Sequence, residues 1–429
     1  MTFRRTSQRI SELCVALSLL TTTAYADAPG EGQITVDPKN PRWLIRKGAG
    51  PFFLCGPGDP EDFLYRGKRN ADGTRTGDQM QIIRKLTGTG ANGIYFQAIR
   101  SHGGDGDRTH NPFINNDPAK GLNPKVLDQW ETWFTELDRA NIVMVFFIYD
   151  DSARIWKTGD VVGDDERDFL RALVARFKHH KNLIWCIAEE YQERFSAKAV
   201  SAIAAVIRNA DDRRHPIAVH KLSGIDFTEF ADDPNIDQFA IQYNAKTTAE
   251  LHKGIVEAWK RAGGRYNLNM SECASHGTGA TARKKSWACA MAGAYVMVLG
   301  MDVATTDVED LKDCGTLVKF FESTEFHRMS PHDELAAAQT EYVLANPPRS
   351  YIAYGANVTG RIGLKQLAAG TYDLLWIDCA TGQRFTEKKV VPRKGDQEWA
   401  KPVGLGTEVA VHIVLVARPP RPRMPTPRR

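Results

Sequence analysis

From about residue 50 to residue 300, short apolar runs alternate with stretches whose apolar residues recur every three to four positions. The run Ile142–Ile148 is almost continuously apolar, which is typical of a strand buried on both faces of a parallel sheet. The stretches between the runs have the period of amphipathic helices. The expected strands are Phe52–Cys55, Gly93–Gln97, Ile142–Ile148, Leu183–Ala188, Ile217–His220, Gln238–Gln242, Tyr266–Ser271 and Ala294–Leu299. The expected helices are Gln79–Leu86, Lys125–Ala140, Glu166–His179, Ala197–Asn209, Thr248–Arg261, Ala282–Met291 and Val308–Phe326.

This alternation predicts the fold class. Eight strand-and-helix units in about 280 residues indicate an α/β protein with a (β/α)8 TIM barrel, which we place at residues 30–340. The alternative is an open doubly wound sheet, which usually has a glycine-rich phosphate turn after its first strand. Here the corresponding segment, Gly56–Pro60, is interrupted by prolines and opens no helix. Dinucleotide binding is therefore disfavoured.

The pattern changes near residue 340, where short β-rich segments follow one another with turns between them. This spacing predicts a small antiparallel β-sandwich domain at residues 341–417. The last segment, residues 418–429, consists mainly of proline and arginine and is expected to be disordered.

The N-terminus has the organisation of a signal peptide. A basic start with Arg4, Arg5 and Arg9 precedes an apolar run at 13–20, and Ala24-Tyr25-Ala26 is a small-x-small cleavage site. The run is too short to span a bilayer. We expect residues 1–26 to be removed and the protein to be secreted or periplasmic; a buried helix is the alternative. Since no other stretch is long and apolar enough, no stable membrane insertion is expected.

Charge and cysteine content narrow the function classes further. The formal net charge is +4, but residues 1–26 contribute +2 and residues 418–429 contribute +5, which leaves the body at −3. A mildly acidic body has no basic surface of the kind that nucleic-acid-binding proteins show. The cysteines after residue 26 are scattered and have no CxxC pairing, so we interpret them as small buried apolar residues. A Cys289–Cys314 disulfide is left open, and the sequence indicates no oligomeric state.

Two glutamates at strand ends are the candidate catalytic residues. The active site of a TIM barrel lies at the carboxyl ends of its strands. The fourth expected strand ends on Glu189 and Glu190, and the seventh is followed by Glu272. Strands four and seven face each other across the barrel mouth. Cleavage of a glycosidic bond needs one protonated carboxyl group and one ionised carboxylate, about 5–5.5 Å apart in retaining enzymes. We therefore predict that Glu190 and Glu272 form this pair and need no cofactor.

Further polar residues near strand ends are candidate substrate-binding residues, although such residues also cap helices or form ion pairs. They are Glu189, Gln242, Tyr243, Asp150, Asp151, His220, His276 and Tyr191. The loop Ser101–Asn116 is rich in Asp, Asn and Gly, but it lacks the ligand spacing of an EF-hand. No HExxH motif occurs, and the first strand has no His-x-His. We therefore predict no catalytic metal.

Several of these segments resemble a known group of enzymes. Asn182–Glu190 (Asn-Leu-Ile-Trp-x-x-x-Glu-Glu) resembles the strand-four motif of clan A glycoside hydrolases, and Met270–Glu272 is similar to their strand-seven nucleophile segment. This resemblance implies a carbohydrate substrate, with Glu190 as acid/base and Glu272 as nucleophile. More narrowly, residues 30–416 resemble the apiosidase-like barrels. Their terminal β-sandwich carries a collagen-binding label, to which we give no functional weight. The segments concerned are Pro51–Leu54, Ser286–Tyr295, Tyr351–Tyr354 and Trp376–Gly382.

One position departs from the clan pattern. The residue before the strand-four acid is usually asparagine, which contacts the sugar 2-hydroxyl, whereas here it is Glu189. We expect this acidic neighbour to raise the pKa of Glu190. The departure leaves two hypotheses: a retaining glycoside hydrolase, or a carbohydrate-binding barrel that has lost catalysis. A peptidase has no supporting Ser/His/Asp, Cys/His or metal motif.

Overall fold

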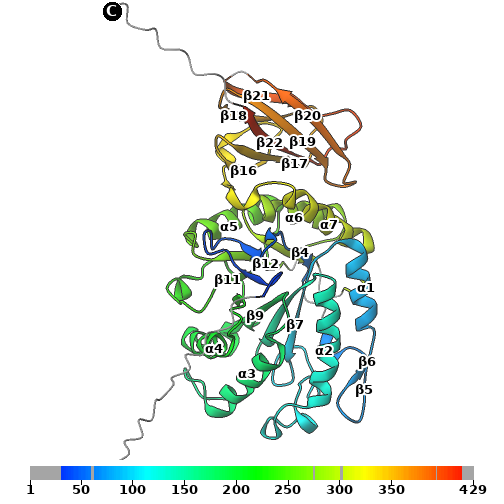
Figure 1. Cartoon of the computed structure of the whole chain (residues 1–429), viewed down its shortest axis with the longest axis vertical. Helices are drawn as coiled ribbons and strands as arrows, with labels where there is room; N and C mark the ends of the chain where they lie inside the picture. The colour runs from blue at the N-terminus through cyan, green and yellow to red at the C-terminus, as the bar shows by residue number, and fades with distance from the viewer. Residues whose placement is uncertain (1–29, 59–61, 274–275, 300–302, 393, 418–429) are drawn as a thin grey trace, which may run out of the picture.

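The computed structural model describes residues 30–58, 62–273, 276–299, 303–392 and 394–417 (Figure 1). The expected signal peptide at 1–26 and the expected tail at 418–429 lie outside the described residues.

A parallel eight-stranded barrel surrounded by helices forms the larger part of the molecule, which confirms the predicted TIM barrel (Figure 1). Its strands are β4 (Cys55–Pro57), β7 (Gly93–Ile99), β8 (Val143–Tyr149), β9 (Leu183–Ala188), β10 (Ile217–Lys221), β11 (Gln238–Gln242), β12 (Asn267–Glu272) and β13 (Tyr295–Leu299). Its helices are α1 (Gln79–Thr89), α2 (Pro124–Arg139), α3 (Asp164–Phe177), α4 (Ala197–Ala210), α5 (Thr248–Arg261), α6 (Ala280–Met291) and α7 (Val308–Glu322). All seven residues of β8 are buried, as expected for a strand between the barrel interior and the helix layer.

The barrel closes between its first two strands, β4 and β7. The Asn92 side chain accepts a hydrogen bond from the Cys55 amide (2.9 Å) and donates one to the Phe53 carbonyl (2.7 Å). Next to this seam the backbones approach so closely that a Cβ on Gly56 would lie 2.2 Å from the Gly93 carbonyl oxygen. Two glycines and one asparagine therefore make closure possible.

A small antiparallel sheet covers the end of the barrel where the strands begin. It consists of β1 (Ile34–Val36), β2 (Leu44–Arg46) and β3 (Gly50–Pro51). The Ile34 amide donates to the Lys181 carbonyl ahead of β9, and the Tyr295 hydroxyl at the start of β13 accepts from the Leu44 amide. This end of the barrel is thus closed, and the opposite end is free for a site.

The C-terminal part forms two antiparallel sheets that enclose a separate apolar core, as expected for the predicted β-sandwich. The first two short strands of the sandwich, Ser330–Pro331 and Ala336–Ala338, lie before residue 341, where we predicted that this domain begins. Both pair with strands that come after residue 341. Tyr342 stacks on His252 of α5, and Tyr354 stacks on Trp287 of α6, so the sandwich packs against the helix layer. The strands are β14 (Ser330–Pro331), β15 (Ala336–Ala338), β16 (Tyr342–Asn346), β17 (Ser350–Gly355), β18 (Arg361–Leu367), β19 (Thr371–Asp378), β20 (Arg384–Val390), β21 (Gly395–Ala400) and β22 (Val409–Ala417).

The six cysteines within the described ranges are all buried and free, as interpreted from the sequence. The alternative of a Cys289–Cys314 disulfide is wrong, because both thiols are unpaired. Within the described part of the chain, no helix combines the length and apolar character needed to cross a membrane.

Candidate active site

Three side chains from the carboxyl ends of three barrel strands meet at the open end of the barrel. Glu190 follows β9, Gln242 ends β11 and Glu272 ends β12. The Gln242 Nε2 donates to Oε1 of Glu190 at 2.7 Å and to Oε1 of Glu272 at 2.6 Å. One amide group therefore holds both predicted catalytic carboxylates.

A second hydrogen bond, at the oxygen of the Gln242 side chain, fixes the orientation of this amide group. Its Oε1 accepts a hydrogen bond from the Ser223 amide at 2.8 Å, so its nitrogen faces the two glutamates. Because a single nitrogen contacts both carboxylates, their Oε1 atoms are separated by at most the sum of the two contact distances, which is about 5.3 Å.

His220, at the end of β10, touches both glutamates from beneath. Its Nδ1 accepts a hydrogen bond from the backbone amide of Glu190 at 3.0 Å, and its Nε2 lies 3.7 Å from Oε2 of Glu272. The imidazole is fully buried, and burial lowers its pKa to about 3. It is therefore a neutral ring whose Nε2–H faces the carboxylate of Glu272.

Glu190 has two features of a reacting group. Its backbone is left-handed (φ 39°, ψ 50°), a conformation that costs a non-glycine residue about 1–3 kcal/mol and clusters at functional sites. Burial raises the pKa of Glu190 to about 7, aided by the carboxylates of Glu272, Glu193 and Asp151 and opposed by the hydrogen bond from Gln242. Burial also raises the pKa of Glu272, while the Gln242 hydrogen bond works against that rise. Near neutral pH, one of the two groups can thus hold a proton while the other is ionised.

Glu189 contributes to the site in a different way from the one predicted. Its Oε2 accepts a hydrogen bond from Gln97 Nε2 of β7 at 2.6 Å, and the side chain is buried. Burial and the carboxylates of Glu272, Glu193 and Asp151 are the main causes of the raised pKa of Glu190, and the effect expected from Glu189 is not among them. The left-handed backbone of Glu190 directly after Glu189 gives the two carboxylates different partners, Gln242 for Glu190 and Gln97 for Glu189.

Asp150 and Asp151 follow β8 at the same rim. Asp150 forms a buried ion pair with Arg100, whose Nε lies 2.9 Å from Oδ2. Asp151 shares an acidic cluster with Glu190 and Glu193, with one oxygen of each within 4.8 Å of the others. Burial, aided by the carboxylates of Asp150, Glu193 and Asp105, raises the pKa of Asp151 to about 6.

Sequence reasoning missed Gln97, Arg100 and Glu193. Gln97 and Arg100 lie at the carboxyl end of β7, where the rule used for the other strands would have found them. Glu193 lies in the turn after β9 and had no comparable signal.

Three of the predicted residues are directed elsewhere. The Tyr191 hydroxyl donates to Glu229 Oε1 at 2.5 Å. The Tyr243 ring lies so close to α5 that a Cβ on Gly254 would be 2.4 Å from it. His276 bonds back to the carbonyl of Cys273, with 3.3 Å between Nδ1 and the oxygen. None of these contacts involves the side chain of Glu190 or Glu272, so a role for the three residues in substrate binding stays a prediction.

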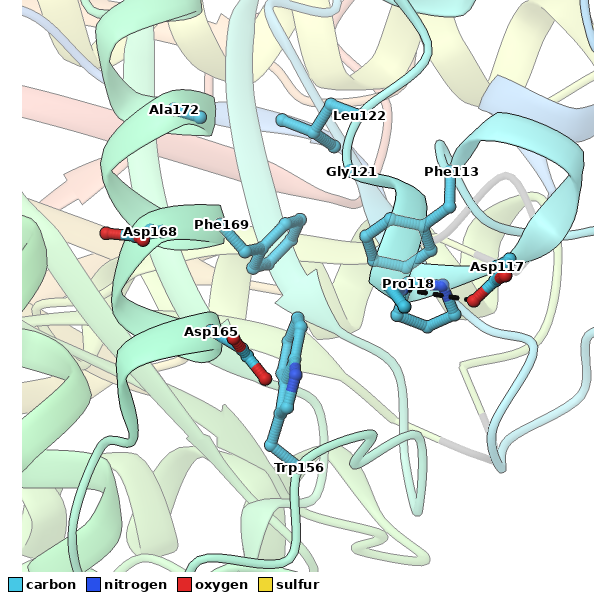
Figure 2. Close-up of a pocket in the computed structure, with 11 residues that line it drawn as sticks. Phe113, Asp117, Pro118, Gly121, Leu122, Trp156, Asp165, Asp168, Phe169 and Ala172 are labelled. Atoms are coloured by element: carbon cyan, nitrogen blue, oxygen red, sulfur yellow. Dashed lines mark hydrogen bonds between the residues drawn. The ribbon is translucent and has the colours of Figure 1, made fainter.

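A cavity of about 670 Å³ lies between α3 and the loop that precedes α2 (Figure 2). Phe113, Trp156 and Phe169 form its apolar wall, and Asp165 and Asp168 lie at its edge (Figure 2). Neither glutamate of the candidate pair lines it, so the cavity is separate from the reacting groups.

The comparison with protein families agrees with this geometry. The model described as "Apiosidase-like, catalytic domain" matches residues 79–301, more than half of the chain. The chain belongs to the apiosidase-like family. The matched residues include Glu190, Gln242 and Glu272, and the family name is that of a glycosidase. No curated protein matches the chain.

Solved structures share the fold of this apiosidase-like protein. One named "Glycoside hydrolase" is 13% identical with a TM-score of 0.65, over 90% of this chain and 97% of the other. A glycoside hydrolase family 5 structure from Bacteroides vulgatus ATCC 8482 is 13% identical with a TM-score of 0.66, over 90% and 94%. A third structure, from the same organism, has the same identity and TM-score, over 90% of this chain and 83% of the other. At this identity the likeness concerns the fold alone.

Proposed function

We propose that this protein is a retaining glycoside hydrolase in which Glu190 is the acid/base and Glu272 is the nucleophile. The observation that carries the proposal is the Gln242 amide, which holds both carboxylates at 2.7 and 2.6 Å. Their Oε1 atoms are at most about 5.3 Å apart. This short distance supports a retaining mechanism, whose carboxyl groups lie about 5–5.5 Å apart, over an inverting one, whose carboxyl groups lie about 6.5–9.5 Å apart.

In the first step, the Glu272 carboxylate attacks the anomeric carbon of the bound glycoside. Glu190 gives its proton to the leaving oxygen, so the glycosidic bond breaks while a glycosyl ester forms on Glu272. The raised pKa of Glu190, about 7, supplies the proton at neutral pH. In the second step, ionised Glu190 takes a proton from water, whose oxygen attacks the anomeric carbon and releases Glu272.

The other residues hold these two groups in place. The Gln242 amide can stabilise the negative charge on either carboxylate, which alternates between them during the cycle. His220 accepts from the Glu190 backbone and presents its Nε2–H to Glu272. Glu189 occupies the position of the asparagine that contacts the sugar in clan A enzymes. Its carboxylate is held by a hydrogen bond from the Gln97 side chain. We propose that it accepts a hydrogen bond from a substrate hydroxyl.

The expected signal peptide points to a substrate outside the cytoplasm, and we propose that the mature protein acts on a glycan or glycoside after export. The family name makes apiosides the first substrates to test.

The test is a screen of the purified mature protein against apiosides and a panel of plant and microbial glycans. On a confirmed substrate, Glu272→Gln should abolish turnover, because an amide cannot form the glycosyl ester. An activated 2-deoxy-2-fluoro glycoside should label Glu272 of the native enzyme, detected by peptide mass spectrometry. Glu190→Gln should slow substrates with poor leaving groups about 10²–10⁴-fold and activated aryl glycosides much less.

A second function, carbohydrate binding without catalysis, is favoured by one observation. Glu189 replaces the asparagine of the clan pattern and is already engaged by Gln97. Binding of a glycan without cleavage, by a protein that no fluoro-glycoside labels, would decide for this alternative. Full activity of both glutamine variants would refute the assignment of the pair.

A further inference from the structure

Two histidines and a glutamate converge at the end of the barrel opposite to the candidate active site. His179 and His180 lie in the turn between α3 and β9, and Glu131 lies on α2. Oε1 of Glu131 is 2.8 Å from Nε2 of His179 and 3.3 Å from Nε2 of His180. These three atoms lie within 4.8 Å of one another. The turn precedes β9, whereas Glu190 follows it, so the two places are separated by the length of the strand.

The protonation of His180 follows from its second ring nitrogen. Nδ1 lies 3.2 Å from Oδ2 of Asp138. The Asp138 carboxylate also accepts hydrogen bonds from the backbone amides of Lys181 at 2.9 Å and Asn182 at 2.8 Å. An ionised carboxylate only accepts, so Nδ1 carries a proton. In the neutral imidazole, Nε2 then has a lone pair and no proton.

No residue that the structure describes donates a hydrogen bond to this lone pair. The His180 side chain is only 2% exposed, and its Nε2 has no hydrogen-bond partner although it faces Oε1 of Glu131. Two acceptor atoms 3.3 Å apart in a buried position repel each other unless a positive charge lies between them. That charge is either a second proton on His180 or a metal ion.

We propose that Glu131, His179 and His180 bind a divalent transition-metal ion, best matched by Zn²⁺. Imidazole nitrogens and a carboxylate oxygen are ordinary zinc ligands. Two ligands of a tetrahedral zinc ion, each about 2.0–2.1 Å from it, lie roughly 3.3–3.4 Å apart, which agrees with the His180–Glu131 distance. His179 starts closer to Glu131, but its side chain is 54% exposed and free to adjust.

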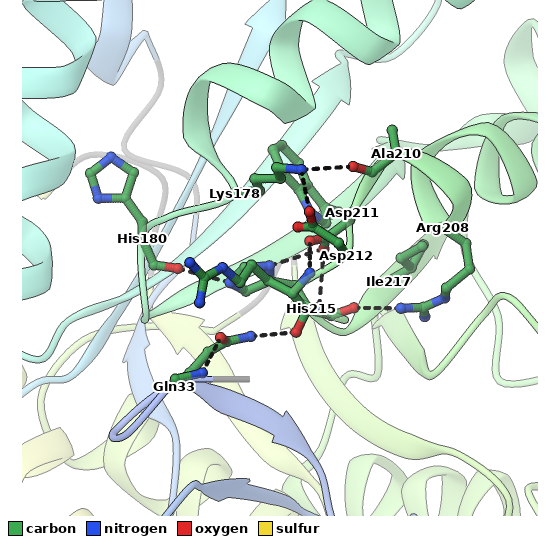
Figure 3. Close-up of polar contacts among 12 residues, drawn as sticks. Gln33, Lys178, His180, Arg208, Ala210, Asp211, Asp212, His215 and Ile217 are labelled. Atoms are coloured by element: carbon green, nitrogen blue, oxygen red, sulfur yellow. Dashed lines mark hydrogen bonds and ion pairs between the residues drawn. The ribbon is translucent and has the colours of Figure 1, made fainter. Parts of the chain in front are cut away.

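The surroundings of the three ligands support a metal rather than a chance cluster. Asp138 orients His180 through Nδ1, as the carboxylate behind a zinc-bound histidine usually does. The His180 carbonyl accepts from the buried His215, which fixes the backbone while the His180 ring turns the other way (Figure 3). Arg176 lies 3.5 Å from Oε2 of Glu131, which leaves Oε1 for the ion. The exposed side of His179 leaves a fourth position for water.

Such an ion joins α2 to the turn between α3 and β9 and has no access to the glycosidic bond. We therefore assign it a structural role: binding to the folded state alone stabilises that state. This proposal does not depend on the proposed function.

The experiment titrates the metal-free mature protein with Zn²⁺ alone, by calorimetry and by thermal unfolding. We expect one ion per chain and a rise of Tm with zinc concentration. His179→Gln and Glu131→Gln should each weaken zinc binding at least tenfold while the metal-free Tm changes little, because His179 is exposed and Glu131 is partly exposed. Co²⁺ should give visible absorption bands in the wild type that disappear in His179→Gln.

The matched control is His332→Gln, which removes another histidine paired with a glutamate, Glu334 at 2.7 Å, but with no second histidine beside it. It should leave zinc binding unchanged. The proposal is overturned if the wild type binds no zinc, or if both ligand variants bind it with unchanged affinity. A proton on His180 would then supply the missing charge.

Discussion

The backbone amide of Glu190 donates a hydrogen bond to Nδ1 of His220, with 3.0 Å between the two nitrogens. This bond links the residue with the raised pKa to a buried ring that stays neutral. It also supports the left-handed backbone at Glu190, which would otherwise be unfavourable. His220 is thus a positioning residue for the acid/base and a neighbour of the nucleophile.

Replacing His220 should therefore lower kcat more than it changes KM. In His220→Phe, the ring volume is kept but the acceptor for the Glu190 amide and the Nε2–H near Glu272 are lost. Loss of one hydrogen bond of about 1–1.5 kcal/mol corresponds to roughly tenfold in kcat. His220→Asn, whose Oδ1 can replace Nδ1 as acceptor, should recover part of the loss. Equal kcat in the wild type and His220→Phe would contradict this role.

The pH profile of kcat/KM should have two limbs. Activity should fall above about pH 7, where Glu190 loses its proton, and fall again in acid, where Glu272 becomes protonated. Since the pKa of Glu272 is also raised, the acid limb should lie above 4.5, the ordinary value for a glutamate. In Glu190→Gln, assayed with an activated aryl glycoside, the alkaline limb should disappear. An unchanged alkaline limb in that variant would assign it to another group.

Gln242 should set the position of both limbs. Its hydrogen bonds lower the pKa of Glu190 and of Glu272, so Gln242→Leu should move both limbs to higher pH as well as reduce kcat. The matched control is Gln238→Leu, on the same strand but at its other end, where the side chain bonds to Asn267 at 2.6 Å. This control should lower stability without moving the pH profile. If both variants shift the profile alike, the effect is a general loss of packing.

The free energy of unfolding should depend on pH through the carboxyl group of Glu190. The pKa of Glu190 is about 7 in the folded state and 4.5 for an ordinary glutamate, so the folded state binds more protons between these values. The contribution of Glu190 to stability therefore decreases as pH rises from about 4.5 to 7. The low pKa of His220 acts in the opposite sense, so the total can be flat. The free energy of unfolding of Glu190→Gln minus that of the wild type, from urea titrations, should increase across this window.

Sequence patterns predicted the barrel strands well because parallel strands buried on both faces are apolar throughout, and β9 and β11 begin and end at the expected residues. The same reasoning placed Glu190, Gln242 and Glu272 at one rim. It could not show which polar side chains pair with each other, because these contacts join strands distant in sequence: Glu189 with Gln97, and Asp150 with Arg100.

The sequence also could not predict the direction in which side chains at strand ends point. Tyr191 and Tyr243 follow strands at positions that suggested the site, but local backbone geometry turns them toward Glu229 and α5. The convergence of Glu131 with His179 and His180 gave no motif, because its ligands come from a helix and a turn 48 residues apart.

The seam between β4 and β7 provides a test of barrel closure that is independent of catalysis. A methyl group on Gly56 would lie 2.2 Å from the Gly93 carbonyl oxygen, and the three atoms nearest to it all belong to the Gly93 backbone, which cannot rotate away. Gly56→Ala should therefore cost about 1–3 kcal/mol or more in the free energy of unfolding, as overpacking does in other cores. Gly88→Ala is the control, since Gly88 lies in α1 with nothing within 4 Å of the added Cβ. There alanine should stabilise the helix by about 0.5–1 kcal/mol. Opposite signs of the two changes in urea unfolding would support the close approach at the seam. Similar small effects would mean that β4 and β7 are farther apart in solution and that the barrel closes differently.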